Sequence, residues 1–531
     1  MLDSFAVLAR TRSGPTRKSL AVATLLALLG LAVRVHAAAQ PLAGLNAYVR
    51  QAMAQWGVPG LAVAVVKDGR VVLARGYGVR ELGKPQRVDA DTLFTIGSNT
   101  KAFTAAALGT LVSAGKLTWN APVAEHLPGF RLESPSLTEQ ITLTDLLAHR
   151  SGYCDPSSMW YTSRDSVANL LRRLRYQHPR YGFRAHFCYD NVMYLVAAQF
   201  IPAITGMSWN RYVAAHLLAP LAMTRTVTST VALKRARDVA QPHGRVHGRI
   251  EVIPRYWAHN LDVFAPVGDI NSSVNDMSHW LLMLLADGRY HGRQVLDPAV
   301  ITAMETPQEP IQRDADLAGL LRTMTPHAHF YAYGRGFLLE DYGGHKLVWH
   351  AGDIDGMSSA VALVPGARLG VVVLSNLNEN GARAGVMFHV LQSYLGLPHR
   401  DVSAALYRAK QRDRRTEQAL EARLAASRRP GSRPPLALGA YTGTFTDDFL
   451  GTARVSEVHG RLEIALGNPM FSGPLKPWHD NTFRVRWRGP YGTDYVTFDV
   501  DALGEPVRLA IAELAVHYER AAPSAPVGGD H

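Results

Sequence analysis

Strand-like runs at both ends of the main part of this chain constrain its fold more than any other feature. Residues 61–66 and 71–77 are rich in β-type residues and flank Lys67-Asp68-Gly69-Arg70, in which Asp-Gly is a strong tight-turn signal. Three more β-rich runs occur at 346–349, 358–364 and 369–375, and helical patterns dominate between them from residue 98 to about 300. We expect an α/β (α+β) fold, with one antiparallel sheet closed by both domain ends, flanking helices and an inserted helical lobe.

The residue pattern of the sequence changes after residue 435. Residues 399–428 predict a charged helix, and the stretch 429–435, rich in Pro and Gly, predicts a linker. Short β-type runs follow at 441–445, 452–458, 462–466, 482–487, 495–500 and 507–511. They predict a small β-barrel or sandwich. The chain of 531 residues is therefore expected to divide into a signal segment (1–39), a main domain (40–398), a basic helix and linker (399–435), a β domain (436–521) and a flexible tail (522–531).

The first 39 residues carry the pattern of a secretory signal. Arg10, Arg12, Arg17 and Lys18 precede an apolar run over 20–33, and small residues at 37–39 supply a cleavage pattern. The run is short for a membrane span. We expect a periplasmic or secreted protein, with an uncleaved N-terminal anchor as the alternative.

Charge and cysteine content limit the classes of partner. The chain has a net charge of +12, but much of the excess lies in 408–433, where only Tyr407 flanks the basic run. A solvated basic linker is favoured over a nucleic-acid site, which would interleave aromatics with the basic residues. Weak attraction to an anionic envelope surface stays open. The only two cysteines, Cys154 and Cys188, exclude a Cys-rich zinc site and leave a disulfide and two free thiols as alternatives.

One short motif supplies a nucleophile and a base. Ser98 and Lys101 lie three residues apart where a helix is expected to begin, so they share a helical face and lie near its positive end. A second S-x-x-K, Ser113 with Lys116, shows that the motif alone is weak evidence. Gly115 is expected to end the helix there and to separate that pair.

Two further motifs follow in order. Tyr189-x-Asn191 is the only Y-x-N of the chain, and His350-x-Gly352 is the only H-x-G. With Ser98-x-x-Lys101 placed first, the set resembles the serine β-lactamase and penicillin-binding superfamily over residues 42–396. It is most similar to the class C-like branch, which includes D-amino-acid peptidases, D,D-carboxypeptidases and esterases of the peptidase S12 type. The β domain resembles the lipocalin-like domain that follows the catalytic unit in some relatives.

The resemblance implies a role for each residue. Ser98 would be the nucleophile, Lys101 would take or relay its proton, and Tyr189 would act as partner base and then as general acid. Asn191 would bind Lys101 or a substrate amide. The backbone N–H groups of Ser98 and of Asp353, which follows Gly352, would form the oxyanion hole.

His350 directs the functional expectation. Many β-lactamases place Lys there, whereas a histidine is largely neutral near pH 7. We expect an exported serine hydrolase that acts through an acyl-enzyme on amide or ester bonds, in a D-amino-acid-containing peptide or ester. The alternatives are a class C-like β-lactamase and a non-hydrolytic penicillin-binding sensor. No cofactor and no metal is expected, because the pair His327 and His329 lacks further ligands.

Overall fold

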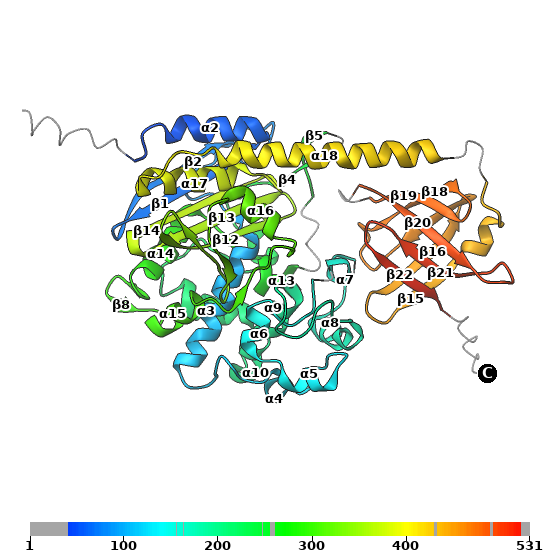
Figure 1. Cartoon of the computed structure of the whole chain (residues 1–531), viewed down its shortest axis with the longest axis horizontal. Helices are drawn as coiled ribbons and strands as arrows, with labels where there is room; N and C mark the ends of the chain where they lie inside the picture. Colours follow the sequence, from blue (N-terminus) through cyan, green and yellow to red (C-terminus); the bar gives the residue numbers. More distant parts are fainter. Residues whose placement is uncertain are drawn as a thin grey trace, which may run out of the picture.

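A computed structural model of the chain describes residues 41–521, except 156, 163, 247, 255–260, 429–432 and 489–491. The predicted signal segment, most of the predicted linker and the predicted tail lie outside the described residues. Figure 1 shows a mixed domain of sheet and helices, a long helix and a C-terminal barrel.

The central sheet has eight strands in the order β2-β1-β14-β13-β12-β11-β10-β9, and all neighbours are antiparallel. The strands are β1 Gly60–Lys67, β2 Arg70–Gly78, β9 Glu309–Pro310, β10 Tyr331–Tyr333, β11 Leu338–Tyr342, β12 His345–Ile354, β13 Met357–Val364 and β14 Leu369–Ser375. Leu61 of β1 pairs with Ser375 of β14, so both ends of the domain meet inside one sheet. The expected fold is therefore confirmed.

Helices cover both faces of this sheet. Alternate residues of β1 face two different cores: Leu61, Val63 and Val65 join one, and Ala62, Ala64 and Val66 join the other. Burial on both faces explains why β1 reads as a continuous apolar run. One face carries α2 Leu45–Trp56 and α17 Ala382–Leu395. The other face carries α3 Thr100–Ser113 and α14 Val274–Leu285.

The helical lobe is inserted between β2 and β9. Its remaining helices are α4 Val123–His126, α5 Pro135–Gln140, α6 Leu143–Leu147, α7 Ser157–Tyr161, α8 Val167–Arg173, α9 Asn191–Ala198, α10 Phe200–Thr205, α11 Trp209–Val213, α12 Thr230–Leu233, α13 Leu261–Gly268 and α15 Pro298–Met304; α16 Ala318–Met324 follows β9. Three small ladders join β3 Phe94–Thr95 to β6 Asn271–Ser272, β4 His243–Val246 to β5 Arg249–Val252, and β7 Arg289–Tyr290 to β8 Arg293–Gln294. Cys154 and Cys188 form a disulfide in this lobe, which settles the alternative that the sequence left open.

The C-terminal unit is a closed barrel of eight antiparallel strands, not a sandwich. The strands are β15 Gly443–Asp447, β16 Gly451–Val458, β17 Arg461–Ala465, β18 Ser472–His479, β19 Thr482–Arg486, β20 Thr493–Val500, β21 Pro506–Ile511 and β22 Val516–Arg520. The sequence patterns missed β18, which contains Pro474 and Pro477, and β22. Two prolines within a run lower its strand signal, because proline cannot donate to a ladder.

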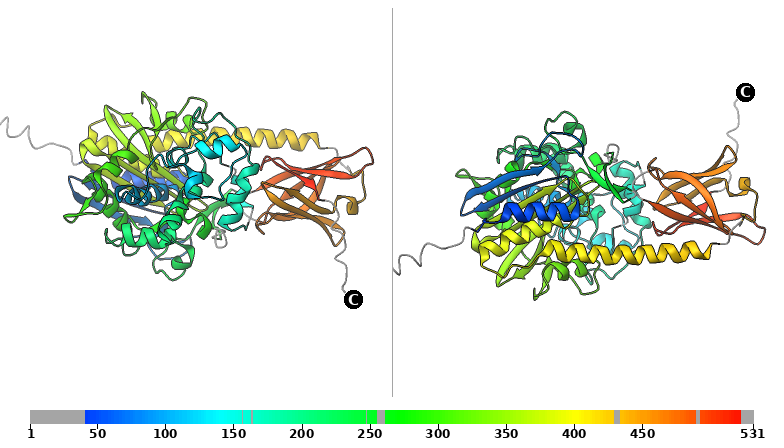
Figure 2. Two further views of the ribbon diagram at one scale, coloured as in Figure 1. Left: turned by 90° about the horizontal axis from the view of Figure 1, so that it is seen from below. Right: turned by 90° about the horizontal axis from the view of Figure 1, so that it is seen from above.

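A single long helix, α18 Val402–Ser427, leads from the first domain toward the barrel. Its first turns pack on the sheet domain through Val402 and Leu406, and the Trp56 indole donates to Ser403 Oγ at 3.1 Å. Its later residues are mostly exposed. The views in Figures 1 and 2 agree that the barrel lies at one end of the molecule, beside α7 and α8.

No single helix among the described residues is long and apolar enough to cross a bilayer, although one bent helix pair, Asn191–Thr205 with Trp209–Leu218, meets the length and composition criteria.

Candidate active site

Ser98 lies in a single 3-10 turn, Gly97–Asn99, from which α3 continues at Thr100. Ser98 therefore precedes the α-helix by two residues, close to the predicted helix start. The second S-x-x-K behaves as predicted: α3 ends at Ser113, and Gly115 has a φ of +67°.

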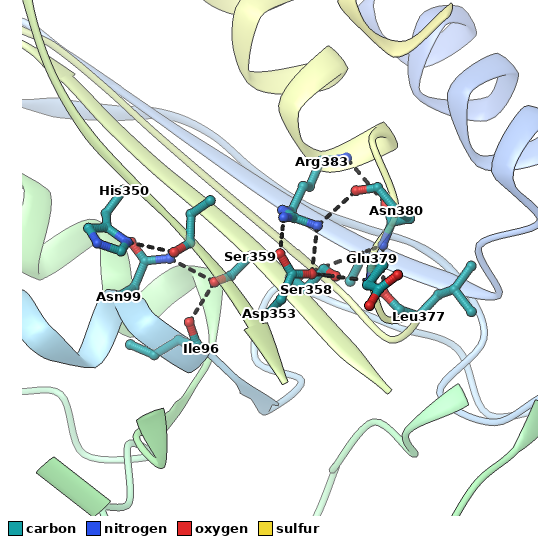
Figure 3. A network of polar contacts seen from close by, with 12 residues as sticks. Ile96, Asn99, His350, Asp353, Ser358, Ser359, Leu377, Glu379, Asn380 and Arg383 are labelled. Carbon is teal, nitrogen blue, oxygen red and sulfur yellow. Dashed lines mark hydrogen bonds and ion pairs between the residues drawn. The ribbon is translucent and has the colours of Figure 1, made fainter. Parts of the chain in front are cut away.

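Two glycines let the serine turn approach strand β12 closely. A Cβ on Gly97 would lie 3.0 Å from the backbone nitrogen of Asp353, and a Cβ on Gly352 would lie 2.1 Å from the Ile96 carbonyl oxygen. Only glycine fits such a backbone contact. Ser359 of β13 also holds the serine turn against the sheet. Its hydroxyl donates to the Ile96 carbonyl at 2.6 Å and accepts from the Asn99 side chain at 2.7 Å (Figure 3). Ser98 is thus held against the strand that carries Asp353.

Lys101 is fully buried and contacts Ser98. Its Nζ donates to Ser98 Oγ at 3.0 Å and to Asn191 Oδ1 at 2.6 Å. Burial lowers the pKa of Lys101 to about 7, although the charges of Asp155 and Asp190 act in the opposite direction. A substantial fraction of the amine is therefore unprotonated near neutral pH and can accept the serine proton.

Tyr189 and Ser98 line one cavity, and Lys101 Nζ lies 4.8 Å from the centroid of the Tyr189 ring. Burial raises the pKa of the Tyr189 phenol above its ordinary value, although a hydrogen bond with Ser98 acts in the opposite direction. The phenol thus rests protonated, which suits it to pass a proton on rather than to start as the base. His149 packs on the Tyr189 ring at 4.2 Å and accepts from the Asp190 N–H at 3.0 Å, so it supports this turn structurally.

Asn191 is the first residue of α9, which Asp190 caps through the N–H groups of Val192 and Met193. Its side-chain amide is fixed from both ends. The oxygen accepts from Lys101, and Nδ2 donates to Asp155 Oδ2 at 2.9 Å. Asp155 is a site residue that the sequence motifs missed, because it follows Cys154 in a segment without any recognisable pattern.

His350 lies on the sheet side of the cavity and is 4% exposed. Its Nδ1 lies 2.6 Å from the Ala351 carbonyl, which makes it the donor, and its Nε2 accepts from the Tyr333 hydroxyl at 2.9 Å. Burial, together with the nearby charge of Lys101, lowers the pKa of His350 to about 3. The ring is therefore neutral at physiological pH. Tyr333 is a partner of His350 that the sequence motifs did not predict.

The side chain of Asp353 turns away from Ser98. Its carboxylate accepts from both terminal nitrogens of Arg383 on α17, from Ser358 Oγ at 2.5 Å and from the Glu379 N–H at 3.1 Å (Figure 3). The Arg383 guanidinium compensates the carboxylate charge beside the site.

Strand β12 offers one edge to the cavity. In the described part of the chain, β11 pairs with β12 only as far as Leu338 with Trp349, whereas β13 pairs on to Ile354. From His350 to Ile354, β12 therefore has a strand neighbour on one side only. An extended substrate segment fits along such an edge.

The cavity around Ser98 has a volume of about 1050 Å³. Its lining is mainly apolar, with Phe187, Leu317, Leu320, Leu338 and Trp349 among the contributors. Tyr189, Asn191 and His350 converge on Ser98 from this lining. A cavity of this size accommodates a peptide or another ligand of several residues. No group of three or more potential metal ligands occurs among the described residues.

Comparison with known families decides the assignment. A family profile described as Beta-lactamase matches residues 45–395, which is most of the chain. The chain belongs to the beta-lactamase family. A second profile, described as a domain of unknown function (DUF3471), matches residues 427–523 and so covers the barrel.

Curated relatives in the beta-lactamase family include hydrolases. The chain is 29% identical over 425 residues to the unguisins hydrolase ungD' of Aspergillus campestris, covering 75% of this chain and 74% of that protein. It is 30% identical over 329 residues to Protein flp of Staphylococcus aureus, covering 61% of this chain and 60% of that protein. Family membership and the assembled site identify the protein as a β-lactamase-related serine hydrolase.

Solved structures support the fold. The octameric penicillin-binding protein homologue from Pyrococcus abyssi matches with a TM-score of 0.58 at 21% identity, covering 88% of this chain and 98% of that one. SurE with D-Leu matches with a TM-score of 0.52 at 18% identity, covering 91% and 99%. The recognition of this family from the ordered motifs is confirmed.

Proposed function

We propose that this beta-lactamase-family protein is an exported hydrolase that cleaves amide or ester bonds in D-amino-acid-containing peptides or esters, through an acyl-enzyme on Ser98. The observation that carries the proposal is the buried Lys101 amine, with a pKa of about 7, at 3.0 Å from Ser98 Oγ. A base matched to neutral pH beside a serine hydroxyl is what serine acylation requires.

The reaction follows from this geometry. Ser98 Oγ attacks the substrate carbonyl carbon while its proton passes to the neutral Lys101 amine. The carbonyl oxygen becomes an oxyanion, which the backbone N–H groups of Ser98 and Asp353 stabilise. When the C–N or C–O bond breaks, the leaving group takes a proton through the Tyr189 phenol, which Lys101 reprotonates. Water then attacks the acyl-enzyme by the reverse proton path and releases the acid and free Ser98.

Substrate class is inferred from charge. Four Lys and Arg side chains line the described cavity, and all but the exposed Arg412 lie within ion-pair distance of a carboxylate. The pairs are Arg180 with Asp316, Arg383 with Asp353 and Lys410 with Glu379. Because His350 is neutral as well, a free substrate carboxylate meets little uncompensated positive charge. This favours internal peptide amides and esters over a β-lactam.

The relatives add to the proposal. One is named for hydrolysing unguisins, and a fold neighbour was solved with D-Leu. These names motivate a preference for D-residues in this chain. Export is proposed from the signal-like segment 1–39, and a disulfide in the first domain is compatible with an oxidising compartment. Association with the cell envelope remains part of the same proposal.

The experiment uses the second S-x-x-K as an internal control. Wild type, Ser98→Ala and Ser113→Ala are incubated with matched D- and L-peptide amides, simple esters and a cephalosporin, and turnover and intact mass are measured. We expect an acyl adduct on Ser98, faster turnover of D-substrates, a loss of ~10⁴-fold or more in Ser98→Ala, and no change in Ser113→Ala.

Each other outcome has a distinct meaning. An adduct on another residue, or turnover that survives Ser98→Ala, contradicts the mechanism. Equal rates on D- and L-substrates would contradict the proposed preference for D-residues but not the acyl-enzyme mechanism on Ser98. Stable labelling of Ser98 by a penicillin without turnover of any substrate supports the sensor alternative instead.

A further inference from the structure

The barrel contacts the catalytic domain at the segment that carries α7. In the connection between β17 and β18, the Asn468 backbone N–H donates to the Thr162 carbonyl at 2.6 Å, and its Nδ2 donates to the Tyr161 carbonyl at 2.8 Å. Asn468 Oδ1 accepts from the Met470 N–H at 3.1 Å, which holds the side chain in this orientation. The contact therefore fixes both carbonyls at the end of α7.

Apolar packing surrounds these hydrogen bonds. Leu450, just before β16, packs against the cores of both the barrel and the catalytic domain, and Tyr161 packs against the barrel core. Gly451 has a φ of +97°, and a Cβ there would lie 2.5 Å from Arg173 of α8. The barrel is thus fitted closely to the α7–α8 region.

From α7, an unbroken series of contacts leads to the nucleophile. The Trp160 ring stacks on Tyr161 at 4.0 Å and lies 4.8 Å from the Phe264 ring. Its indole N–H donates to Asp155 Oδ1 at 3.2 Å. Asp155 in turn accepts from the Asn191 side chain, whose oxygen accepts from Lys101.

Asp155 determines which way the Asn191 amide faces. An Asn side chain has a donor end and an acceptor end of nearly the same shape, so its partners set the orientation. With Asp155 on the donor end, the oxygen must face the Lys101 amine. Without a fixed Asp155, the amide can rotate and point its own N–H groups at that amine.

The opposite end of this segment is fixed as well. The disulfide joins Cys154 to Cys188, and the Asp155 N–H donates to the Tyr189 carbonyl at 3.0 Å. Asp155 therefore lies between a covalent tie on one side and the barrel-bound α7 on the other.

We propose that the barrel is a positioning element of the active site: by holding α7 through Asn468, it keeps Trp160 against Asp155 and so orients Asn191 toward Lys101. The inference rests on the proposed function for the roles of Ser98 and Lys101. It assigns the barrel a catalytic consequence beyond linking, oligomerisation or stability, and it makes Asn468, Trp160 and Asp155 positioning residues.

A double-mutant cycle tests this coupling. Asn468→Asp keeps the shape of the side chain and its cap on Met470 but loses the donor to Tyr161, and Trp160→Phe keeps an aromatic ring but loses the donor to Asp155. Each single change is expected to lower kcat about 3- to 10-fold with little change in KM. The double variant should lose little more than the larger single change, because both act through Asp155. Lys476→Ala, on the exposed side of β18, is the matched control.

The pH profile separates positioning from general destabilisation. The titratable groups that face Lys101 are Asp155, Asp190, His149, His350, Tyr189 and Tyr194. Because the Asp155 charge raises the pKa of Lys101, moving Asp155 away should shift the acidic limb of kcat/KM to lower pH in Asn468→Asp and Trp160→Phe. A merely structural loss lowers the rate at every pH and leaves the limb in place.

Amide hydrogen exchange keeps the inference separate from the proposed function. In Asn468→Asp, exchange in 157–162 should quicken, and exchange in 189–191 should follow, whether or not Ser98 is the nucleophile. Fully additive kinetic losses, an unmoved acidic limb, or unchanged exchange at 189–191 would each overturn the inference. Failure of Ser98 labelling in the wild type would overturn the proposed function alone.

Discussion

The helical side of the cavity and its sheet side handle charge in different ways. On the helical side, Lys101 is buried next to Asp155 and Asp190, so its pKa is about 7 and its protonation can change during a reaction. On the sheet side, His350 is neutral and the Asp353 carboxylate is paired with Arg383. In the proposed reaction, the helical side moves protons and the sheet side provides a fixed environment for the substrate carbonyl.

Burial is the main cause of the lowered pKa on both sides of the cavity, at Lys101 and at His350. Taking Lys101 out of water produces a base that is active at neutral pH, and taking His350 out of water removes its charge. The two residues differ in their partners. Lys101 contacts the Ser98 hydroxyl, with which it exchanges a proton in the proposed reaction, whereas His350 makes hydrogen bonds with Tyr333 and the Ala351 carbonyl.

Removing the base should have the largest effect. Lys101→Met keeps the length of the side chain but cannot accept a proton, so kcat/KM should fall by ~10³-fold or more. Lys116→Met, in the second S-x-x-K, is the control and should retain wild-type activity. Steady-state kinetics with an activated ester measure both. A kcat/KM of Lys101→Met within ten-fold of the wild-type value would show that Lys101 is not the base, and the helical side would then not differ from the sheet side in moving protons.

The pH dependence should report the helical side alone. Lys101 must be unprotonated to act, so well below its pKa of about 7 kcat/KM should fall by about ten-fold per pH unit, and by roughly 50-fold in total from pH 7 to pH 5. Tyr189, with its raised pKa, should leave the rate level up to pH 9. Rates across pH 5 to 9 test this. An acidic limb of kcat/KM with its midpoint near pH 10 would show that the pKa of Lys101 is not lowered.

Breaking the ion pair on the sheet side should have an intermediate effect. Arg383→Ala leaves the Asp353 carboxylate uncompensated beside the developing oxyanion, and kcat/KM should fall about 10- to 100-fold. Adding Asp353→Asn to this variant should restore part of the loss by removing the charge. Arg368→Ala, which breaks an exposed pair with Asp68, should cost almost nothing. No recovery in the double variant would show that the charge is not the cause.

Replacing the neutral histidine should have the smallest effect. The oxygen of Gln in His350→Gln can accept from the Tyr333 hydroxyl, so kcat/KM should change by less than about 5-fold. Thermal unfolding serves as a check on folding. A loss approaching that of Lys101→Met would mean that His350 exchanges protons, and the contrast between the two sides would fail.

Local sequence rules were enough for residues that lie close together along the chain. Ser98 and Lys101 are one helical turn apart, so their contact follows from helix geometry. Tyr189 and Asn191 were reached through their motif. The five strand candidates of the main domain lie within β1, β2, β12, β13 and β14, and burial along almost the whole of β1, β13 and β14 explains their dense apolar runs. Strands β9, β10 and β11 were not predicted; β9 has only two residues and β10 only three.

Tertiary structure supplied the rest. Asp155 enters the site through a disulfide and a neighbouring helix end, neither of which leaves a local pattern. The direction of the Asp353 side chain depends on Arg383, which is 30 residues away. A largely neutral His350 was expected from the ordinary pKa of histidine, but the further lowering of that pKa follows from burial beside Lys101, which the motif does not reveal.

The closure of the central sheet by its two ends also bears on how the protein is made. The Gly60 N–H donates to the Asn376 side chain, 316 residues further along, and β1 can pair with β14 only when both have been synthesised. A growing chain that has already emerged as far as His350 therefore still lacks the strand that completes the sheet. Contacts this distant in sequence slow folding. We expect release of nearly the whole first domain to precede its folding, so the sheet beside Ser98 stays incomplete until synthesis has passed that residue by about 280 residues.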